Sequence, residues 1–327
     1  MARRLRPILL LAGLGASAVL TYLALRDVDF DGFVDALGGG DPMWLGASFL
    51  VFVGAYALRI VRWRLLFEPS RRPPLRSLVR PVLAGEFFTS LLPALRLGEL
   101  ARVVLLHRAT RIPRADALGT VVAERVHDVA ALLVLLFLAV PFVPPVTWLR
   151  GAAVMLALVA SVILLAVVSL NRFGSRPIGF LLRPLALVPG FSRARTELAA
   201  AGVLRGLGGL QTPRVALTAF GLSVLSWCGI ALSFVLALRV VGIEVGLAAG
   251  ILVAVATSFS LLLPSLPASV GIFEAAVLVA LAPYDVNDAR ALSGAVVIHV
   301  MSFVPFLVAG PLALRGHAVR VRSRLSD

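Results

Sequence analysis

Two interrupted apolar segments, SLLPALRLGE at residues 90–99 and LLLPSLPASVGIFE at residues 261–274, lie at matching places in the two halves of this 327-residue chain. Irregular backbone at membrane depth is tolerated where it is buried in protein or lines a wet cavity. Paired interruptions of this kind point to a binding site between the repeats of a transporter fold. The interrupting residues are Pro93, Gly98 and Glu99 in the first segment and Pro264, Pro267, Gly271 and Glu274 in the second.

The composition indicates a polytopic integral membrane protein. Hydrophobic residues make up 60% of the chain and charged residues 15%, and the mean hydropathy of +0.98 is far above that of a soluble domain. The net charge of +14 comes from arginines that gather in short loops between apolar runs, where they set topology and meet anionic lipid. We therefore exclude nucleic acid as a partner. The single cysteine, Cys228, excludes an internal disulfide, a four-cysteine zinc site and an iron–sulfur cluster, and no cofactor is expected.

Apolar runs separated by charged loops predict an all-α polytopic membrane fold of about six spanning helices and two re-entrant helical hairpins, eight hydrophobic units in all. Arginine-rich loops flank the first hairpin on both sides, so both of its ends are predicted to be cytoplasmic. The apolar runs of the second hairpin could instead form two short crossings. The predicted spans are 8–25, 43–67, 118–140, 148–170, 215–241 and 291–314, and the predicted hairpins are 78–106 and 246–282.

This order of elements predicts one integral membrane domain, residues 1–327, with an inverted-repeat architecture. The block 43–140 would run in the opposite sense to the block 215–314, so that the hairpins enter from opposite faces and meet near the midplane. Residues 171–214 carry seven arginines and one glutamate and are predicted to form an arginine-rich cytoplasmic loop. We expect both termini to be cytoplasmic and the membrane to be the inner (cytoplasmic) membrane.

Ionisable side chains within the predicted membrane segments are the candidates for chemistry, because each costs about 2.5–3.5 kcal/mol at the centre of a spanning helix. Glu124 and Asp128 are four residues apart and share one helix face. We expect Arg125, three residues before Asp128, to pair with it, which leaves Glu124 to pair with Arg102 of the first hairpin. Glu99 adds another carboxylate to this region. The alternative is a structural lattice of salt bridges, or arginines that extend to the cytoplasmic interface.

Glu274 is isolated in the sequence, since no arginine occurs between Arg239 and Arg290. Its partner must come from elsewhere in the fold, or the carboxyl group must be protonated, and such a desolvated carboxyl could carry a proton or bind a cation. The alternative is a protonated glutamate that hydrogen-bonds a backbone carbonyl freed by the nearby prolines. His299 stands alone in the last predicted span and is interpreted as a packing residue.

These residues together resemble the ordered motifs of the lysylphosphatidylglycerol synthase transmembrane-region family, also called flippase-like proteins. The similarity spans about residues 7–315. The first motif has two residues, Ala94 and Leu95, between its proline and its arginine, where one is expected. The motifs are Leu91-Leu92-Pro93 with Arg96, Gly98, Glu99 and Arg102, then Glu124-Arg125 with Asp128, then Leu263-Pro264 with Pro267, Gly271 and Glu274, and also Arg62-Trp63.

The resemblance implies a lipid translocase that binds or moves an anionic phospholipid or a polyprenyl-phosphate-linked lipid in cell-envelope biogenesis. Larger members add a soluble aminoacyltransferase domain, for which this chain leaves no room, so lysyl transfer is not expected. Arginine suits a lipid phosphate because its planar guanidinium binds two oxygens at once and stays charged. The expected phosphate ligands are Arg96, Arg102 and Arg125, and the expected charge-compensating or proton-coupling residues are Glu99, Glu124, Asp128 and Glu274.

Two other classes of function are open. An integral-membrane enzyme acting on a lipid phosphate or glycosyl carrier requires a nucleophile or a metal, and the sequence has neither a Gly-x-Ser-x-Gly elbow nor Asp and His residues grouped at ligand spacing. We therefore expect no enzymatic activity and no metal site. The other class is a scaffold for an envelope glycosyltransferase, which would dock on residues 171–214. No Walker A pattern occurs, so any energy for transport must come from a gradient or a partner.

Overall fold

Helices make up the regular structure of the computed structural model, which describes residues 38–91, 97–145, 201–208, 212–261 and 269–323, together with scattered positions between 151 and 174. No strand occurs among these residues. Within them, four helices are long and apolar enough to cross a membrane. These are α3 (Pro42–Leu65), α6 (Arg114–Ala139), α11 (Pro213–Val240) and α14 (Asp288–Ser323). The all-α membrane fold predicted from the sequence is confirmed.

The long helices present apolar side chains outward, as contact with lipid requires. Only 17% of the most apolar window of α3 is buried, and Phe137 of α6 is 80% exposed. Described positions of the predicted span 148–170 are helical and also expose apolar side chains, among them Val154 and Leu165. In a soluble protein such surfaces would be covered, so the outward face of this bundle is the lipid face.

The first hairpin is built from two antiparallel helices. After the 3-10 turn η1 (Pro69–Arg71), α4 (Leu75–Leu91) is followed by α5 (Leu97–Thr110), which packs back along it. The contact is backbone to backbone, because a Cβ added to Gly98 would lie 2.3 Å from the carbonyl oxygen of Gly85. These helices are the arms of the hairpin predicted over 78–106. Pro93 and Arg96 fall in 92–96, outside the described residues.

The second hairpin has even shorter arms. α12 (Leu247–Ser260) and α13 (Ile272–Leu281) have 14 and 10 residues, which is about 21 and 15 Å at 1.5 Å per residue. A spanning helix must cover about 30 Å, so these lengths favour the re-entrant interpretation of 246–282 over two crossings. The N-cap of α13 is Gly271, whose φ of 86° suits glycine, and the turn η6 (Ala282–Tyr284) follows the helix. Pro264 and Pro267 fall in 262–268, outside the described residues.

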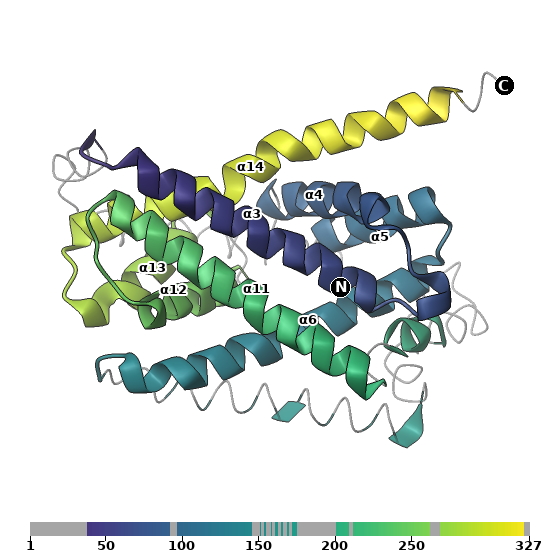
Figure 1. The fold of residues 1–327 in the computed structure, drawn as a ribbon, viewed down its shortest axis with the longest axis horizontal. Helices are drawn as coiled ribbons and strands as arrows, with labels where there is room; N and C mark the ends of the chain where they lie inside the picture. The colour runs from purple at the N-terminus through teal and green to yellow at the C-terminus, as the bar shows by residue number, and fades with distance from the viewer. Residues whose placement is uncertain are drawn as a thin grey trace, which may run out of the picture.

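The two halves of the chain use the same order of elements in opposite directions (Figure 1). α3 is followed by the α4–α5 hairpin and α6, and α11 is followed by the α12–α13 hairpin and α14. α3 and α11 lie antiparallel, since the amide of Asp41 donates to the carbonyl of Val240 at 3.3 Å and Gly229 lies against Ala55. The hairpins therefore lie toward opposite ends of the bundle. This is the arrangement that an inverted repeat requires.

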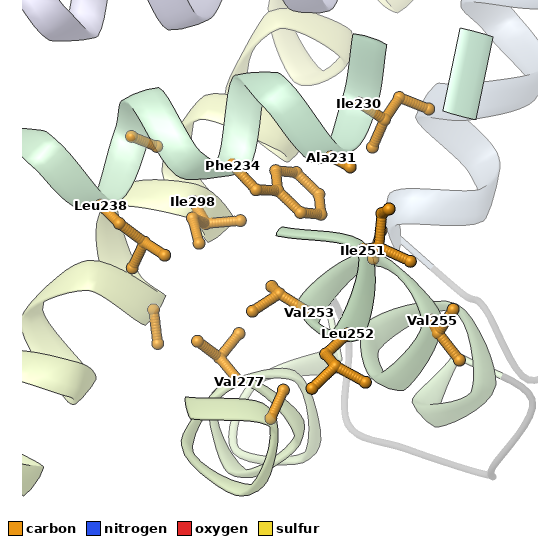
Figure 2. Close-up of a cluster of buried hydrophobic side chains, with 14 of the residues drawn as sticks. Ile230, Ala231, Phe234, Leu238, Ile251, Leu252, Val253, Val255, Val277 and Ile298 are labelled. Carbon is orange, nitrogen blue, oxygen red and sulfur yellow. The ribbon is translucent and has the colours of Figure 1, made fainter. Parts of the chain in front are cut away.

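The largest apolar cluster lies around the second hairpin (Figure 2). α12 approaches α11 closely there, because a Cβ on Gly250 would lie 2.4 Å from the carbonyl oxygen of Ala231. A smaller apolar cluster, which includes Trp63, packs between α3, the first hairpin and α6. The larger cluster joins α11, α12, α13 and α14 through Phe234, Leu238, Leu252, Val277 and Ile298.

The observed helices agree with the predicted spans 43–67, 118–140, 215–241 and 291–314. α14 continues past 314 to Ser323, because the arginines that follow Leu314 are good helix formers. The predicted span 8–25 and most of the loop 171–214 lie outside the described residues. Its longest described part, 201–208, packs on the start of α6, where Arg205 pairs with Asp116 at 3.0 Å.

Candidate functional site

Charged side chains from α3, α5 and α6 meet inside the bundle, and Arg62 of α3 is their centre. Arg62 is completely buried. Its Nη1 donates to Asp128 Oδ1 and, at 2.7 Å, to Ser223 Oγ of α11. Its Nη2 lies 2.9 Å from Glu124 Oε1. One guanidinium thus joins both carboxylates of α6 to a hydroxyl of α11.

Arg102 reaches the same carboxylates from the first hairpin. Its Nη2 and Nη1 lie 2.7 and 3.4 Å from Glu124 Oε2 and Oε1, so the pair is bidentate. Gly85 makes room for it, because a Cβ there would lie 2.3 Å from Arg102 Cγ. The guanidinium also lies 4.2 Å from the ring centroid of Trp63, a favourable cation–π distance. The predicted pairing of Arg102 with Glu124 is confirmed.

Arg125 connects α6 to the start of α5. Its Nε lies 3.0 Å from Glu99 Oε1, and its Nη1 lies 3.6 Å from Asp128 Oδ2. The predicted pairing of Arg125 with Asp128 is therefore present, at a longer distance than the contact with Glu99. The side chains of Arg125 and Glu99 are 43% and 24% exposed, whereas Arg62 and Arg102 are buried. This is the accessible side of the charged cluster.

Arg59, one helical turn before Arg62, lies beside Asp128 with aromatic rings around it. Its Nη2 is 3.7 Å from Asp128 Oδ1, and its guanidinium carbon is 4.4 Å from the ring of Trp227 and 5.3 Å from that of Tyr56. The indole N–H of Trp227 donates to Asp128 Oδ1 at 3.0 Å. Arg59 Nε and Nη2 are buried without a hydrogen-bond partner among the described residues.

Helical spacing explains why these side chains converge. Arginines three apart on α3 and carboxylates four apart on α6 each share one face of their helix. Glu86 of α4 also interacts electrostatically with three of the arginines. We refer to the following residues as the arginine cluster: Arg59, Arg62, Arg102, Arg125, Glu99, Glu124 and Asp128.

The arginine cluster has buried donors that are not used by hydrogen bonds within the described residues. Buried guanidinium N–H groups are expected to be hydrogen-bonded, and those of Arg59 described above are not. Arg102 Nε is buried without a hydrogen-bond partner in the described part of the chain as well. A phosphate offers acceptor oxygens of the right charge and geometry for such donors.

A second ionisable pair lies at the second hairpin. Glu274 Oε2 accepts a hydrogen bond from the amide of Gly271 at 2.6 Å, which caps α13. Its Oε1 contacts Nδ1 of His299 on α14. The rings of Phe273 and Phe303 lie 4.6 and 4.4 Å from the imidazole. The partner of Glu274 is thus a histidine from elsewhere in the fold, one of the two possibilities that the sequence left open.

Three of these residues, Arg59, Arg62 and His299, are not among the site residues predicted from the sequence. Arg59 and Arg62 fall near the end of the predicted span 43–67, where arginines have a common explanation in membrane topology, although their spacing of three and the adjacent Trp63 distinguish them from loop arginines. His299 was interpreted as a packing residue, although it is the ionisable side chain in the middle of the last span and Glu274 lacked a partner. The predicted phosphate ligand Arg96 lies outside the described residues.

Comparison with known proteins agrees with the resemblance seen in the sequence. The family model described as the lysylphosphatidylglycerol synthase TM region matches residues 10–310, which include the arginine cluster and the Glu274–His299 pair. No curated protein matches the chain. No group of three or more His, Cys, Asp or Glu side chains able to hold a metal occurs among the residues that the structure describes.

Proposed function

The chain belongs to the lysylphosphatidylglycerol synthase TM region family of membrane proteins, and we propose that it binds the phosphate of an anionic lipid headgroup at the arginine cluster and moves that lipid across the membrane. The lipid is an anionic phospholipid or a polyprenyl-phosphate-linked lipid of the cell envelope. Both share the phosphate, which is the group that the cluster would recognise. The membrane we expect is the inner membrane, with both termini cytoplasmic.

The observation that carries this proposal is that arginines inside an apolar bundle keep buried N–H groups without hydrogen bonds to any described residue. Burying a charge in a membrane protein is expensive, so such charges face the protein interior or a hydrated path and mark sites of function. A lattice built only for stability would be expected to use its buried donors internally. Arg59 instead keeps two buried nitrogens without hydrogen bonds to any described residue.

The arginines divide into two groups by what they already contact. Arg62 and Arg102 are buried, and they form ion pairs with Asp128 and Glu124, respectively. Their main role is to hold these carboxylates in place. Arg62 and Arg102 also keep buried nitrogens without hydrogen bonds to any described residue, but their close carboxylate contacts hold them in place. Arg125 is accessible, and the contact of Arg59 with Asp128 is longer, at 3.7 Å. We therefore assign the direct contacts with phosphate to Arg59 and Arg125. The phosphate-binding role expected for Arg102 then becomes an indirect one.

Glu99 gives the site a way to exchange partners. It contacts Arg125 at 3.0 Å from the start of α5, on the accessible side of the cluster. A headgroup phosphate could replace the Glu99 carboxylate on Arg125. The guanidinium of Arg125 would then already be oriented to bind it. Exchange of one anion for another keeps the guanidinium paired throughout, which avoids an unpaired charge inside the membrane.

Native mass spectrometry of the purified protein in mild detergent tests headgroup binding. The protein is offered equal amounts of phosphatidylglycerol, phosphatidylcholine and undecaprenyl phosphate, and the retained lipids are quantified. We expect wild type to retain an anionic lipid selectively, and Arg59→Gln and Arg125→Gln to retain it at least tenfold less. Arg205→Gln is the matched control, because it removes the same charge from a half-exposed arginine paired with Asp116 outside the cluster. Equal retention of all three lipids by wild type would refute the proposal.

Movement is tested in proteoliposomes of phosphatidylcholine that contain fluorescent NBD-phosphatidylglycerol, with dithionite as the quencher of the outer leaflet. Wild type is expected to expose the inner-leaflet probe and Arg59→Gln to slow that exposure tenfold. Selective binding without any exchange would overturn the translocase and favour the scaffold for a glycosyltransferase. Chemical conversion of undecaprenyl phosphate-linked substrate by the pure protein would overturn it in favour of an enzyme.

A further inference from the structure

A cavity lies at the end of the bundle where α3 begins and α11 ends. Its volume is about 860 Å³, and small-molecule sites typically have about 300–1,000 Å³. Three parts of the chain enclose it: the end of α11 with the loop that follows, residues 240–245; the turn η6 with the first residues of α14, within 284–290; and Gly39, just before α3. The cavity is therefore large enough for a ligand and is built from segments far apart in the sequence.

This cavity and the arginine cluster lie at opposite ends of α3. Gly39 lines the cavity, and Arg59 follows the first residue of α3, Pro42, by 17 residues, which is about 26 Å at 1.5 Å per residue. The hydrocarbon core of a bilayer is about 30 Å thick. The start of α3 and the end of α11 lie at the left of Figure 1, and the first hairpin lies at the right. In the topology expected from the arginine-rich loops, the cavity faces the extracytoplasmic side.

The side chains of the cavity carry charges of both signs. Glu244 and Asp285 contribute carboxylates and Arg290 a guanidinium, and all three residues are exposed. In the part of the chain that the structure describes, no ion pair joins them. An anion would be repelled by the carboxylates, and a metal ion would meet the guanidinium and only two acids. A neutral ligand with many hydroxyls can donate to the carboxylates and accept from the guanidinium.

The start of α14 is not an open phosphate site. Free amides at a helix start attract phosphate. Here Asn287 Oδ1 accepts from the amides of Ala289 and Arg290 at 3.0 and 3.4 Å, so these donors are already used. The side chains therefore supply most of the binding capacity of the cavity.

Apolar side chains and a tyrosine complete the lining. Val241, Ile243 and Val286 line the cavity beside its polar groups. A sugar ring presents C–H groups on its faces and hydroxyls at its edge, so it matches walls of both kinds. Tyr284 also lines the cavity, and its hydroxyl is buried without a hydrogen-bond partner among the described residues. Buried tyrosine hydroxyls usually have such a partner, which a ligand hydroxyl would provide.

We propose that this cavity binds the sugar of a glycosylated lipid headgroup. Sugar binding needs no lipid movement, but the place of the cavity on the route of the lipid rests on the proposed function. The arginine cluster would take up the phosphate from one side of the membrane, and the cavity would receive the sugar on the other. Of the two lipid classes proposed above, this favours a polyprenyl-phosphate-linked lipid that carries a sugar. A free sugar offers the same hydroxyls, so the test separates the two sources.

Native mass spectrometry of the full chain in mild detergent tests the cavity with lipids that carry a sugar and no phosphate. The protein is offered equal amounts of diglucosyldiacylglycerol, digalactosyldiacylglycerol and diacylglycerol with the same acyl chains. We expect wild type to retain at least one glycolipid fivefold more than diacylglycerol. Maltose is offered separately at the same concentration. Binding of maltose without retention of either glycolipid would overturn the lipid source and assign the cavity to a free sugar.

The variants Glu244→Gln and Asp285→Asn remove the charged acceptors and keep the size of the side chains. Asparagine also tolerates the φ of 53° at position 285. We expect each variant to retain about fivefold less glycolipid, because a hydrogen bond to a charged acceptor is stronger than one to a neutral acceptor. Glu68→Gln is the matched control, because it removes an exposed glutamate beyond the other end of α3. Thermal unfolding of each variant checks that it folds like wild type.

The outcomes separate this proposal from the proposed function. Equal retention of lipids with and without a sugar by wild type would overturn sugar binding. Folded variants that retain the glycolipid like wild type would overturn its assignment to this cavity. If Glu244→Gln or Asp285→Asn unfolds, Tyr284→Phe, which removes only a hydroxyl, gives the second comparison and should also lose retention. Selective glycolipid retention without selective retention of phosphatidylglycerol or undecaprenyl phosphate would defeat the phosphate site and leave the sugar site standing.

Discussion

Replacing Arg62 by methionine should destabilise the protein through the carboxylates that it leaves behind. The guanidinium hydrogen-bonds Asp128 and lies 2.9 Å from Glu124 in a fully buried position. Methionine keeps most of the volume and removes the charge. Removing one partner of a buried ion pair typically costs about 3–5 kcal/mol, because the remaining charge is uncompensated.

The structure places the expected loss at the lower end of that range. Glu124 keeps its bidentate contact with Arg102, and Asp128 keeps the indole N–H of Trp227 with Arg59 and Arg125 at 3.7 and 3.6 Å. We therefore expect Arg62→Met to lose about 3 kcal/mol of unfolding free energy. In Arg62→Met/Asp128→Asn the uncompensated carboxylate is gone, so the loss should fall short of the sum of the single losses by about 2 kcal/mol.

The measurement is a double-mutant cycle on reversible unfolding in mixed dodecylmaltoside and SDS micelles, followed by tryptophan fluorescence. Interhelical hydrogen bonds in a membrane protein average about 0.6 kcal/mol in such cycles. A coupling energy well above that value identifies Arg62 as the counter-ion of Asp128. A coupling energy at or below about 0.6 kcal/mol would refute the reasoning, since Arg62 would then act as an ordinary hydrogen-bond donor.

Two further predictions concern packing and surface charge. Gly98→Ala should destabilise the first hairpin by about 1–3 kcal/mol, because its Cβ would lie 2.3 Å from the carbonyl oxygen of Gly85; the same unfolding assay measures it, with Gly54→Ala, where no atom lies within 4 Å, as the control. Arg205→Gln should cost less than about 1 kcal/mol, because the arginine is half-exposed in its pair with Asp116; a larger loss would show that the 201–208 segment depends on this pair for its docking on α6.

Much of the fold could be predicted because long apolar runs in a sequence identify membrane segments. The apolar runs 43–67, 118–140 and 215–241 became α3, α6 and α11 with ends shifted by a few residues. The broken segments around Gly98 and Gly271 became short paired helices, as their prolines and glycines predict, although Pro81 and Pro305 lie inside α4 and α14.

The site was predictable where helical spacing or a shortage of other candidates limited the possible partners. Arg125 and Asp128 could be paired from their spacing, and Arg102 with Glu124 from the lack of other candidates. Arg62 and His299 could not, because each finds its carboxylate on another element across 66 and 25 residues of sequence. The sequence holds no distance information between such elements, and arginine near a helix end has a common explanation in membrane topology.

The two hairpins differ in charge although they occupy equivalent places: the first brings arginines to its half of the bundle, and the second brings a glutamate. In the proposed translocase, an anionic headgroup would therefore meet an attractive field from one side of the membrane and not from the other, and loading would be faster from one leaflet. Unequal rates of entry leave the equilibrium distribution of the lipid unchanged, because the return path is altered by the same factor. Sustained enrichment of one leaflet would require the headgroup to move together with something that flows down its own gradient.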